Sequence, residues 1–502
     1  MNNLKEIFSN IDYEILNGEI DKEITEIVYD SRKVTKGSVF FCFVGANFDA
    51  HEFIDQVIEN EPAAIIVEKD IEITEKFNDI TIIKVPSKKD GENYGTRFAL
   101  GEASAKFFDE PAKKLKMIGI TGTKGKTSTT STIQITLNNA GIKCGTIGTV
   151  GIDDGKEHVP SKTTTPESFE IQKALVRMIE NGCKACVMEV SSQALMLNRV
   201  AGIEFDYGIF TNMSIDHIGE AEHKDFDDYV HCKSLLFKMS KTGIFNKDDE
   251  QFENMTKNAS CKILTYAYDN EADLKAYDFK YLREGEFIGS TFSTKGIVDD
   301  NFKISAPGKF SMYNALPVIL LSKELKISND VIKESLMQIH VKGRMEPVKI
   351  SSKFHLLIDY AHNAVSTESI LKAMREYDPG RIVSLFGCGG NRSKTRRYEM
   401  GEASGKYADF SIITEDNSRF EKVDDIISDI LVGMKKTDGE YIVIPDRKEA
   451  IKYAIQSAKE GDIILLLGKG HEDYQEKNGE RKPFDERVII KEILDEINWQ
   501  YD

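Results

Sequence analysis

The feature that most constrains the fold is a glycine-rich segment at residues 117–130, "MIGITGTKGKTSTT". The apolar run "LKMIGI" has the length of a β-strand, and "STTSTIQITLNNAG" can form a helix that ends at Gly141. A strand, a glycine-rich turn and a helix N-terminus together bind phosphate, because free amide groups and the helix dipole face the anion. The segment therefore predicts an α/β domain with a nucleotide phosphate site.

The match to the usual phosphate-loop motif is incomplete. That motif has a glycine five positions before its Gly-Lys-Thr, where this chain has Ile120. The shorter form, Gly122 to Thr127, keeps the lysine and the threonine that contact phosphate and Mg²⁺. An ordinary turn between a strand and a helix is the alternative, and Lys126-Thr127 in the right position argues against it.

Length and composition favour a multidomain protein that does not bind nucleic acid. The 502 residues exceed the size at which one core stops growing, so we expect two to four domains. The formal net charge of −17 argues against nonspecific binding to DNA, RNA or anionic membranes. The N-terminus shows no secretory signal, and no apolar run approaches the roughly 20 residues of a membrane helix.

The cysteines indicate a reducing compartment. The seven cysteines are an odd and scattered set, in which Cys183 and Cys186 form a CxxC pair. A structural zinc site would need a second pair, and this pair runs straight into the apolar strand "CVMEV". We therefore expect buried thiols without a metal, and a cytoplasmic protein.

The pattern of strands and helices predicts three domains. Residues 1–95 form a small mixed α/β domain, and residues 96–342 alternate strands and helices as in a mostly parallel sheet. Shorter polar strands around residues 270–306 predict an antiparallel hairpin at its edge. Residues 343–502 alternate again and predict a Rossmann-like domain. Tandem α/β domains usually leave a cleft that nucleotides favour.

Polar residues follow the strands downstream of the glycine-rich loop. The strand "ACVMEV" carries Glu189, a carboxylate of the kind that coordinates Mg²⁺ beside a phosphate loop. The exit of the next strand carries Asn212, Asp216 and His217. Lys233, on a helix with apolar neighbours, is by its spacing alone typical of a surface lysine.

Three residues nearer the third segment could contact a nucleotide. The cation of Arg344 can reach a γ-phosphate, and the carboxylate of Asp359 can accept from a ribose hydroxyl. The amide of Asn314 could meet an adenine edge. Each is weak evidence alone, because a Gly-Arg turn or an aspartate at a strand end is common.

Taken together, these stretches resemble the Mur ligase family of ATP-dependent amide-forming enzymes over essentially the whole chain. The resemblance rests on "GITGTKGKTS", "TTTPES", "MEVSSQAL", "TNMSIDHIG", "YVHCKSLLF", "GKFSMYNAL", "GRMEPV", "IDYAHN", "FGCGGNRSKTRR", "EDNSR" and "LGKGHEDYQ". The last three are similar to members that add a diamino acid to UDP-N-acetylmuramoyl-L-alanyl-D-glutamate. The implied reaction phosphorylates a substrate carboxylate with ATP, and an amine then displaces phosphate from the acyl phosphate.

The resemblance implies which residues bind the nucleotide and the metal. The ATP loop would comprise Gly122, Thr123, Lys124, Gly125, Lys126, Thr127 and Ser128, with further nucleotide contacts from Asn314, Arg344 and Asp359. Mg²⁺ would be held by Thr127, Glu189 and His217. The catalytic residues would be Lys126, Glu189, His217, Lys233 and Arg344. Lys233 matches a position that is carbamylated in relatives, which would turn its ammonium into a carboxylate-like group.

The resemblance also implies two sites for the other substrates. The UDP-linked dipeptide would contact Ser31, Ala46, Asn47, Phe48, Thr164, Thr165, Ser191 and Arg199. The incoming amino acid would contact Arg397, Asp416, Asn417, Ser418, Arg419, Gly468 and Glu472.

The identity of the amino acid depends on the stretch Asp416–Arg419, which reads Asp-Asn-Ser-Arg. Members that use meso-diaminopimelate typically have Asp-Asn-Pro-Arg, whose arginine can pair with the distal carboxylate, and lysine-adding members usually lack that arginine. Serine for proline loosens the turn and removes no charge, so diaminopimelate is favoured over L-lysine. Relatives often have a glutamine at Leu197, aspartates at Asn391 and Ser393, and a proline after "DYAH", so a divergent paralogue for another amino acid stays open.

Three other functions remain as alternatives. A folate-polyglutamate or cyanophycin-type ligase is disfavoured by "DSRKVTKGSVFFCFVGANFDAHEF", which resembles a UDP-binding domain. A noncatalytic nucleotide-binding protein is disfavoured because all the catalytic candidates are present. A small-molecule kinase would release a stable phosphorylated product. We expect a cytoplasmic monomer of peptidoglycan precursor synthesis that uses ATP, Mg²⁺, the UDP-N-acetylmuramoyl dipeptide and a diamino acid.

Overall fold

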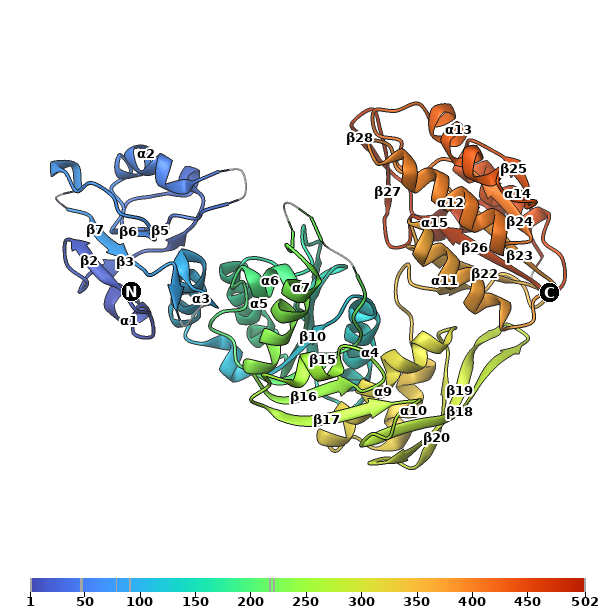
Figure 1. Ribbon diagram of the computed structural model, residues 1–502, viewed down its shortest axis with the longest axis horizontal. Coiled ribbons are helices and arrows are strands. Elements are labelled where there is room, and N and C mark those ends of the chain that lie inside the picture. The colour runs from blue at the N-terminus through green and yellow to red at the C-terminus, as the bar shows by residue number, and fades with distance from the viewer. Residues whose placement is uncertain are drawn as a thin grey trace. The chain divides into compact units, whose positions relative to one another are not determined.

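The computed structural model describes residues 2–45, 48–77, 79–89, 92–215, 218–219 and 222–500. Its chain forms two compact units, Met1–Leu274 with Pro317–Ile327, and Lys275–Leu316 with Ser328–Asp502. Both units are mixed α/β, as the sequence predicts (Figure 1). The three-domain division with boundaries at residues 95 and 342 stays a prediction. Among the described residues, no helix combines the length and the apolar character needed to cross a membrane.

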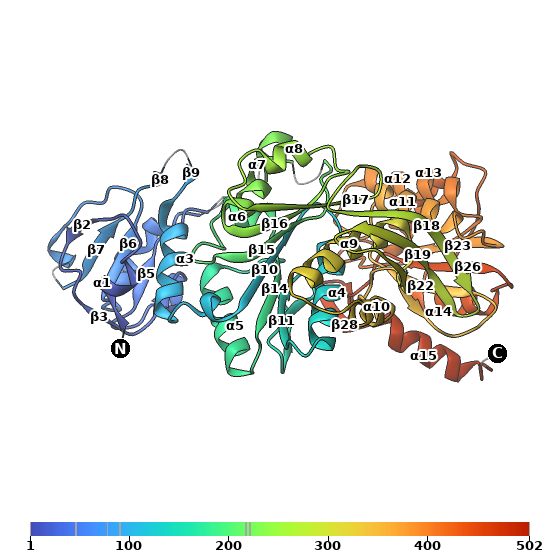
Figure 2. The same cartoon turned by 90° about the horizontal axis from the view of Figure 1, so that it is seen from below.

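The first unit begins with a five-stranded sheet in the order β2-β7-β6-β5-β4. Its strands are Glu14–Asn17 (β2), Ile27–Val28 (β4), Val39–Phe41 (β5), Ala64–Val67 (β6) and Thr81–Lys84 (β7). Strands β4 to β7 are parallel and β2 is antiparallel to β7, and Figure 2 shows α3 beside this sheet. Side chains of β5 alternate between two cores, which α3 (Gly95–Phe107) and α2 (Ile54–Ile58) cover on opposite faces.

The rest of the first unit is built on a larger sheet in the order β13-β12-β11-β14-β10-β15-β16-β17. The parallel strands are Lys116–Thr121 (β10), Cys144–Gly148 (β11), Ala185–Glu189 (β14), Phe205–Phe210 (β15), Ser240–Asn246 (β16) and Lys262–Ala267 (β17). Gly151–Asp153 (β12) and His158–Val159 (β13) add an antiparallel edge. The helices include Lys126–Asn139 (α4), Ser168–Glu180 (α5), Ser192–Met196 (α6), Phe226–Ser234 (α7) and Phe252–Thr256 (α8). The glycine-rich loop, Glu189 and Thr211 therefore meet at one edge of the sheet.

The second unit begins with two long strands, Leu274–Glu284 (β18) and Phe287–Gly296 (β19), and a shorter one, Asp300–Ile304 (β20). Strands β19 and β20 pair antiparallel, which confirms the hairpin predicted around residues 270–306. Helix α9 (Lys309–Glu324) starts in this unit and ends in the first, and α10 (Asn329–Met337) follows.

The C-terminal sheet has the order β21-β22-β26-β23-β24-β25. Its strands are Glu346–Val348 (β21), His355–Asp359 (β22), Arg381–Phe386 (β23), Phe410–Ile413 (β24), Glu440–Val443 (β25) and Asp462–Leu467 (β26), all parallel except β21. Ala364–Arg375 (α11), Lys394–Tyr407 (α12) and Val423–Met434 (α13) cover one face (Figure 1), and Arg447–Gln456 (α14) and Glu486–Glu496 (α15) the other. Because β26 is inserted between β22 and β23, the strand order reverses there, which is where such sheets bind ligands.

Candidate active site

The loop between β10 and α4 has the shape of a phosphate-binding loop. Gly122 and Gly125 have φ values of 148° and 86°, and a Cβ on Gly122 would lie 2.0 Å from Thr211 Oγ1. Asn212 holds the loop from the neighbouring strand: its carbonyl accepts from Thr123 N at 2.8 Å and its side-chain oxygen from Lys124 N at 2.9 Å. The glycines and Asn212 therefore fix the backbone ahead of the N-terminus of α4.

Two ammonium groups converge on this loop. Lys126 Nζ donates to Gly122 O at 2.7 Å, and Lys233 Nζ donates to the same oxygen at 2.8 Å. Lys233 comes from α7, is 1% exposed and lies 4.7 Å from the ring centre of Tyr229. Spacing alone favoured a surface position for Lys233, and that expectation is wrong, because α7 packs this face against the loop. Both charges favour an anion at the mouth of the loop.

Glu189 lies at the end of β14 beside the first turn of α4 and is 2% exposed. Its Oε2 accepts from Thr127 Oγ1 at 3.0 Å and from Thr149 Oγ1 at 3.1 Å, and its Oε1 accepts from Thr149 N at 3.0 Å. Gly148 makes room for this carboxylate, because a Cβ there would lie 2.3 Å from Glu189 Oε1. A hydroxyl and a carboxylate side by side are the hard oxygen donors that Mg²⁺ prefers, so the pair fits that ion.

Three predicted site residues, Ala46, Asn47 and His217, lie outside the described residues, as does Asp216. A second histidine, His223, is fully buried, and one ligand atom each from His223, Asp228 and Cys232 lie within 4.8 Å of one another. Two of the three are already joined to each other, by a 3.0 Å hydrogen bond between His223 Nδ1 and Asp228 Oδ2. We therefore assign no ion to the three.

The structure brings together four of the residues predicted to bind the UDP-linked dipeptide. Thr165 Oγ1 donates to Glu189 O at 2.9 Å and accepts from Ser191 N at 3.1 Å. Arg199 donates to Thr165 O at 3.1 Å. Thr164 Oγ1 lies 3.1 Å from Thr149 Oγ1, which itself contacts Glu189.

Two residues next to the N-terminal sheet, Arg97 and Tyr29, contact the same region, and sequence reasoning missed both. Arg97 of α3 pairs with Glu167 at 2.9 Å, and Arg199 pairs with the same carboxylate at 3.0 Å. Tyr29 OH donates to Glu170 at 3.4 Å, and burial with the Glu170 charge raises the Tyr29 pKa. The predicted Ser31 follows two residues later, at the start of a 3₁₀ turn. The predicted Phe48 is 54% exposed, so its ring is open to a ligand.

In the second unit, Asp359 is the last residue of β22, and its carboxylate accepts two backbone hydrogen bonds. Its Oδ2 accepts from Met345 N and its Oδ1 from Ala361 N, both at 2.8 Å. Burial raises the pKa of this carboxyl, and the nearby Arg344 opposes the rise. The Arg344 guanidinium lies 5.0 Å from the ring centre of Tyr360, and Asn314 lies in α9. The nucleotide contacts of these three residues stay predictions.

The residues predicted to bind the amino acid lie at the carboxyl edge of the C-terminal sheet. Asn417 Nδ2 donates to Glu472 Oε2 at 2.8 Å. The side chain of Asp416 lies against Gly468, the residue after β26: a Cβ on Gly468 would lie 2.5 Å from Asp416 Oδ2. Ser418, which takes the place of the usual proline, is 1% exposed. Two carboxylates therefore gather where the strand order reverses.

Of the arginines in this region, Arg397 is buried, Arg419 is half-buried, and Arg392 and Arg396 are exposed. Arg397 is 1% exposed and is paired with Glu421 at 2.7 Å and Asp429 at 2.9 Å. A Cβ on Gly389 would lie 3.5 Å from Arg419 Nη1 and 3.8 Å from Arg392 Cγ, and Arg392 is exposed. The geometry thus favours Arg392 and Arg419 over Arg397 as contacts for an incoming carboxylate. Sequence reasoning missed Arg392, although it stands in the "GGNRSKTRR" stretch.

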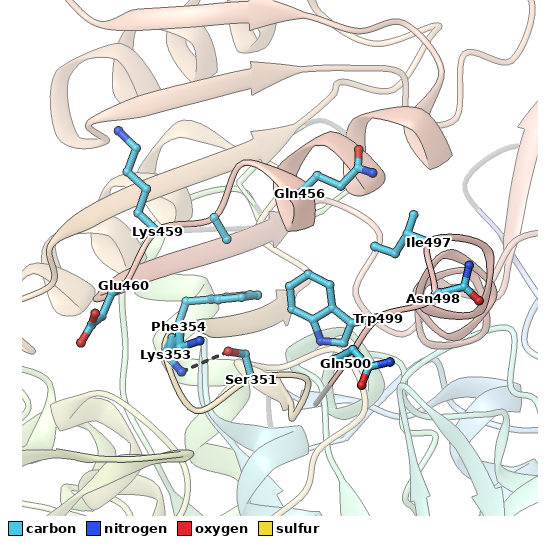
Figure 3. Close-up of a pocket in the computed structure, with 11 residues that line it drawn as sticks. Ser351, Lys353, Phe354, Gln456, Lys459, Glu460, Ile497, Asn498, Trp499 and Gln500 are labelled. Carbon is cyan, nitrogen blue, oxygen red and sulfur yellow. Dashed lines mark hydrogen bonds between the residues drawn. The ribbon is translucent and has the colours of Figure 1, made fainter. Parts of the chain in front are cut away.

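A pocket of about 610 Å³ lies at the opposite edge of the same sheet (Figure 3). Phe354, which precedes β22, and Glu460, which precedes β26, line it together with Trp499. The pocket is thus at the amino ends of the parallel strands, whereas open α/β sheets bind ligands at the carboxyl ends. We assign it no part in the chemistry.

Comparison with known proteins matches two consecutive parts of the chain to family models. Residues 120–322 match the Mur ligase middle domain, and residues 343–470 match the Mur ligase, glutamate ligase domain. In sequence, the chain is similar to UDP-N-acetylmuramoyl-L-alanyl-D-glutamate–2,6-diaminopimelate ligase 1 of Clostridium acetobutylicum, with 41% identity over 98% of this chain and 99% of that protein. The corresponding ligase of Clostridium tetani is 40% identical over 98% of this chain and 99% of its own length.

Solved structures agree with the sequence matches. A structure of a UDP-N-acetylmuramoyl-L-alanyl-D-glutamate–2,6-diaminopimelate ligase superimposes with a TM-score of 0.73 at 25% identity, covering 99% of this chain and 100% of that chain. The MurF ligase of Thermotoga maritima in complex with ADP has the same fold, with a TM-score of 0.56 at 18% identity, over 89% of this chain and 94% of that one. With relatives of this similarity over nearly its whole length, the chain belongs to the Mur ligase family.

Proposed function

We propose that this protein is an ATP-dependent ligase that joins meso-diaminopimelate to UDP-N-acetylmuramoyl-L-alanyl-D-glutamate in peptidoglycan precursor synthesis. The observation that carries the proposal is the Thr127–Glu189 pair beside a glycine-rich loop on which two lysines converge. The names of the similar proteins support the choice of both substrates. The assignment includes a cytoplasmic monomer, as the sequence predicts.

The first unit supplies the groups that an acyl-phosphate reaction needs. The loop amides and Lys126 would bind the β- and γ-phosphates of ATP, and Thr165, Ser191 and Arg199 would bind the UDP-linked dipeptide. Thr127 and Glu189 would hold Mg²⁺, which offsets the negative charge of the phosphates when bound. Carbamylation of Lys233 belongs to this proposal, because it would turn a cation beside the loop into an anionic group.

The second unit supplies a site of mixed charge for the amino acid. The carboxylates of Asp416 and Glu472 suit the ammonium groups of a diamino acid. The guanidinium groups of Arg419 and Arg392 suit the carboxylate of its distal centre, which diaminopimelate has and L-lysine lacks. The bound amine then attacks the activated carbonyl of the dipeptide, and inorganic phosphate leaves.

A competition assay tests this proposal directly. The purified enzyme receives ATP, Mg²⁺, the UDP-linked dipeptide and an equimolar mixture of meso-diaminopimelate and L-lysine, and mass spectrometry identifies the tripeptide product. We expect the diaminopimelate product to dominate. The Arg392→Ala and Arg419→Ala variants should lose most of that preference. Without the guanidinium group, the distal carboxylate of diaminopimelate has no partner, so diaminopimelate binds no more tightly than L-lysine.

The matched control is Arg375→Ala, since Arg375 pairs with Asp409 at the end of α11 and lies away from the carboxyl edge. Faster joining of L-lysine by the wild-type enzyme would overturn the choice of amino acid. ADP release that needs neither amino acid, with a stable phosphorylated product, would favour a kinase, and no turnover under any condition would favour a noncatalytic protein.

A further inference from the structure

One buried lysine of the second unit has no role so far. Lys469 follows β26 between Gly468 and Gly470, which have φ values of 109° and 52°, and its side chain is 0% exposed. Lysine is almost never fully buried unless it is paired, because burial removes the hydration of its charge. Its surroundings should therefore explain why the charge is kept.

The Lys469 ammonium lies among residues of the predicted amino-acid site. Its Nζ lies 3.1 Å from Asn417 Oδ1, 3.3 Å from Glu472 Oε2 and 3.9 Å from Asp416 Oδ1. The rings of Tyr474 and Phe484, at 5.7 and 5.9 Å from Nζ, flank it. One cation is thus shared by two carboxylates and an amide oxygen in a site walled by aromatic rings.

This contact determines how Asn417 is oriented. Asn417 Oδ1 accepts from Lys469 and also from Glu476 N at 2.9 Å, so the amide nitrogen must face the other way. That nitrogen donates to Glu472 Oε2 at 2.8 Å. Lys469 and Glu476 N together select one of the two amide orientations, and Lys469 also draws Glu472 toward Asn417.

The same charge keeps two carboxylates close together. Without a cation between them, the carboxylates of Asp416 and Glu472 would repel each other, and one would turn away. The incoming diamino acid brings ammonium groups that need those carboxylates ionised and in place.

We propose that Lys469 is a positioning residue that holds Asn417, Glu472 and Asp416 in the arrangement that binds the amino acid. The inference rests on the proposed function, because it assigns that substrate to these three residues. Lys469 acts through them and makes no contact with the reacting atoms.

The test measures the kinetic constants of the Lys469→Met variant and of the wild type for each substrate. This substitution removes the charge and keeps the bulk of the side chain. We expect the KM for diaminopimelate to rise about 10- to 100-fold, as for lost hydrogen bonds to charged groups, while the KM values for ATP and the UDP-linked dipeptide stay within about twofold. Lys469→Arg, which keeps the charge, should restore part of the loss. Lys482→Met, a change at an exposed lysine of β28 (Glu480–Pro483), should leave all constants unchanged.

Equal rises in all three KM values, a fall in kcat alone, or no change would overturn the inference. If Lys469→Met does not fold, Lys469→Arg decides alone: a KM increase confined to diaminopimelate supports the positioning role, and an unselective or absent effect refutes it. Wild-type enzyme that does not join diaminopimelate would instead refute the proposed function, so the two failures are distinguishable.

Discussion

At the scale of single residues, the carbonyl oxygen of Gly122 is the focus of the phosphate loop. It accepts from both Lys126 and Lys233, so two positive charges lie against one edge of the loop. In the chain without carbamylation of Lys233, the two ammonium groups repel each other, and a phosphate bound at the loop offsets that repulsion. The arrangement is thus one that a phosphate group stabilises.

Removing Lys126 should therefore remove catalysis and spare the binding of the other substrate. Lys126→Ala should lower ADP release about 100- to 1,000-fold, the usual cost of one preorganised donor to a reacting group. The Kd of the UDP-linked dipeptide, measured by calorimetry, should stay nearly unchanged, because Lys126 is not among its predicted contacts. Lys143→Ala, at an exposed lysine before β11, is the control. Ordinary turnover by Lys126→Ala would remove the lysine from the mechanism.

The role of a single arginine is harder to predict from the sequence than the stretch that contains it. The stretch "GGNRSKTRR" offers Arg392, Arg396 and Arg397, and spacing along the chain does not tell which guanidinium is buried. The start of α12 turns Arg397 inward onto Glu421 and Asp429, acidic partners that lie more than 20 residues further along the chain. Only the folded chain shows which arginine is buried in ion pairs and which is exposed.

At the scale of elements, the sequence predicts strands better than it predicts polar or glycine-containing elements. The buried strands β10, β14, β22 and β26 follow from continuous apolar runs. Helix α12 is harder to predict, because Gly401 and Gly405 lower its helix propensity. These glycines are needed for packing: a Cβ on Gly401 would lie 2.2 Å from Ile430 O of α13. The hairpin of β27 (Tyr474–Lys477) and β28 is polar throughout and gave no alternating signal.

His355, the first residue of β22, should make the free energy of unfolding depend on pH. His355 is 7% exposed, and burial, with Arg283 adding to it, lowers its pKa to about 4 from 6.5. Below pH 6.5 the unfolded chain binds a proton at this histidine and the folded chain does not, until the pH falls to about 4. Between pH 7 and pH 5 the wild type should therefore lose about 2 kcal/mol more unfolding free energy than His355→Gln.

Urea unfolding can follow this change through Trp499, the single tryptophan, whose ring lies 6.1 Å from that of Phe354, the residue before His355. His158→Gln, at an exposed histidine of β13, serves as the control for a histidine change away from the C-terminal sheet. Parallel pH profiles of the wild type and His355→Gln would show that the histidine is protonated equally in both states.

At the scale of the whole molecule, the two units carry different parts of the proposed reaction. The first has the loop, the Thr127–Glu189 pair and the residues predicted for the UDP-linked dipeptide. The second has the carboxylates and arginines at the carboxyl edge of its sheet. Neither set makes an amide bond alone, because one activates an acid and the other holds an amine. The proposed chemistry therefore requires that one oxygen atom of the activated carboxylate end up in the released phosphate.

Oxygen labelling provides the corresponding measurement. If the D-glutamyl carboxylate carries ¹⁸O, its phosphorylation forms a bridging bond to that oxygen, and attack by the amine breaks the bond between the carbonyl carbon and that oxygen. The released inorganic phosphate should then contain a single labelled oxygen, which mass spectrometry or the ³¹P isotope shift detects. The control reaction uses unlabelled substrate in H₂¹⁸O and should yield unlabelled phosphate. Label from water in the phosphate would mean that ATP is hydrolysed directly, and the acyl phosphate would have no place in the reaction.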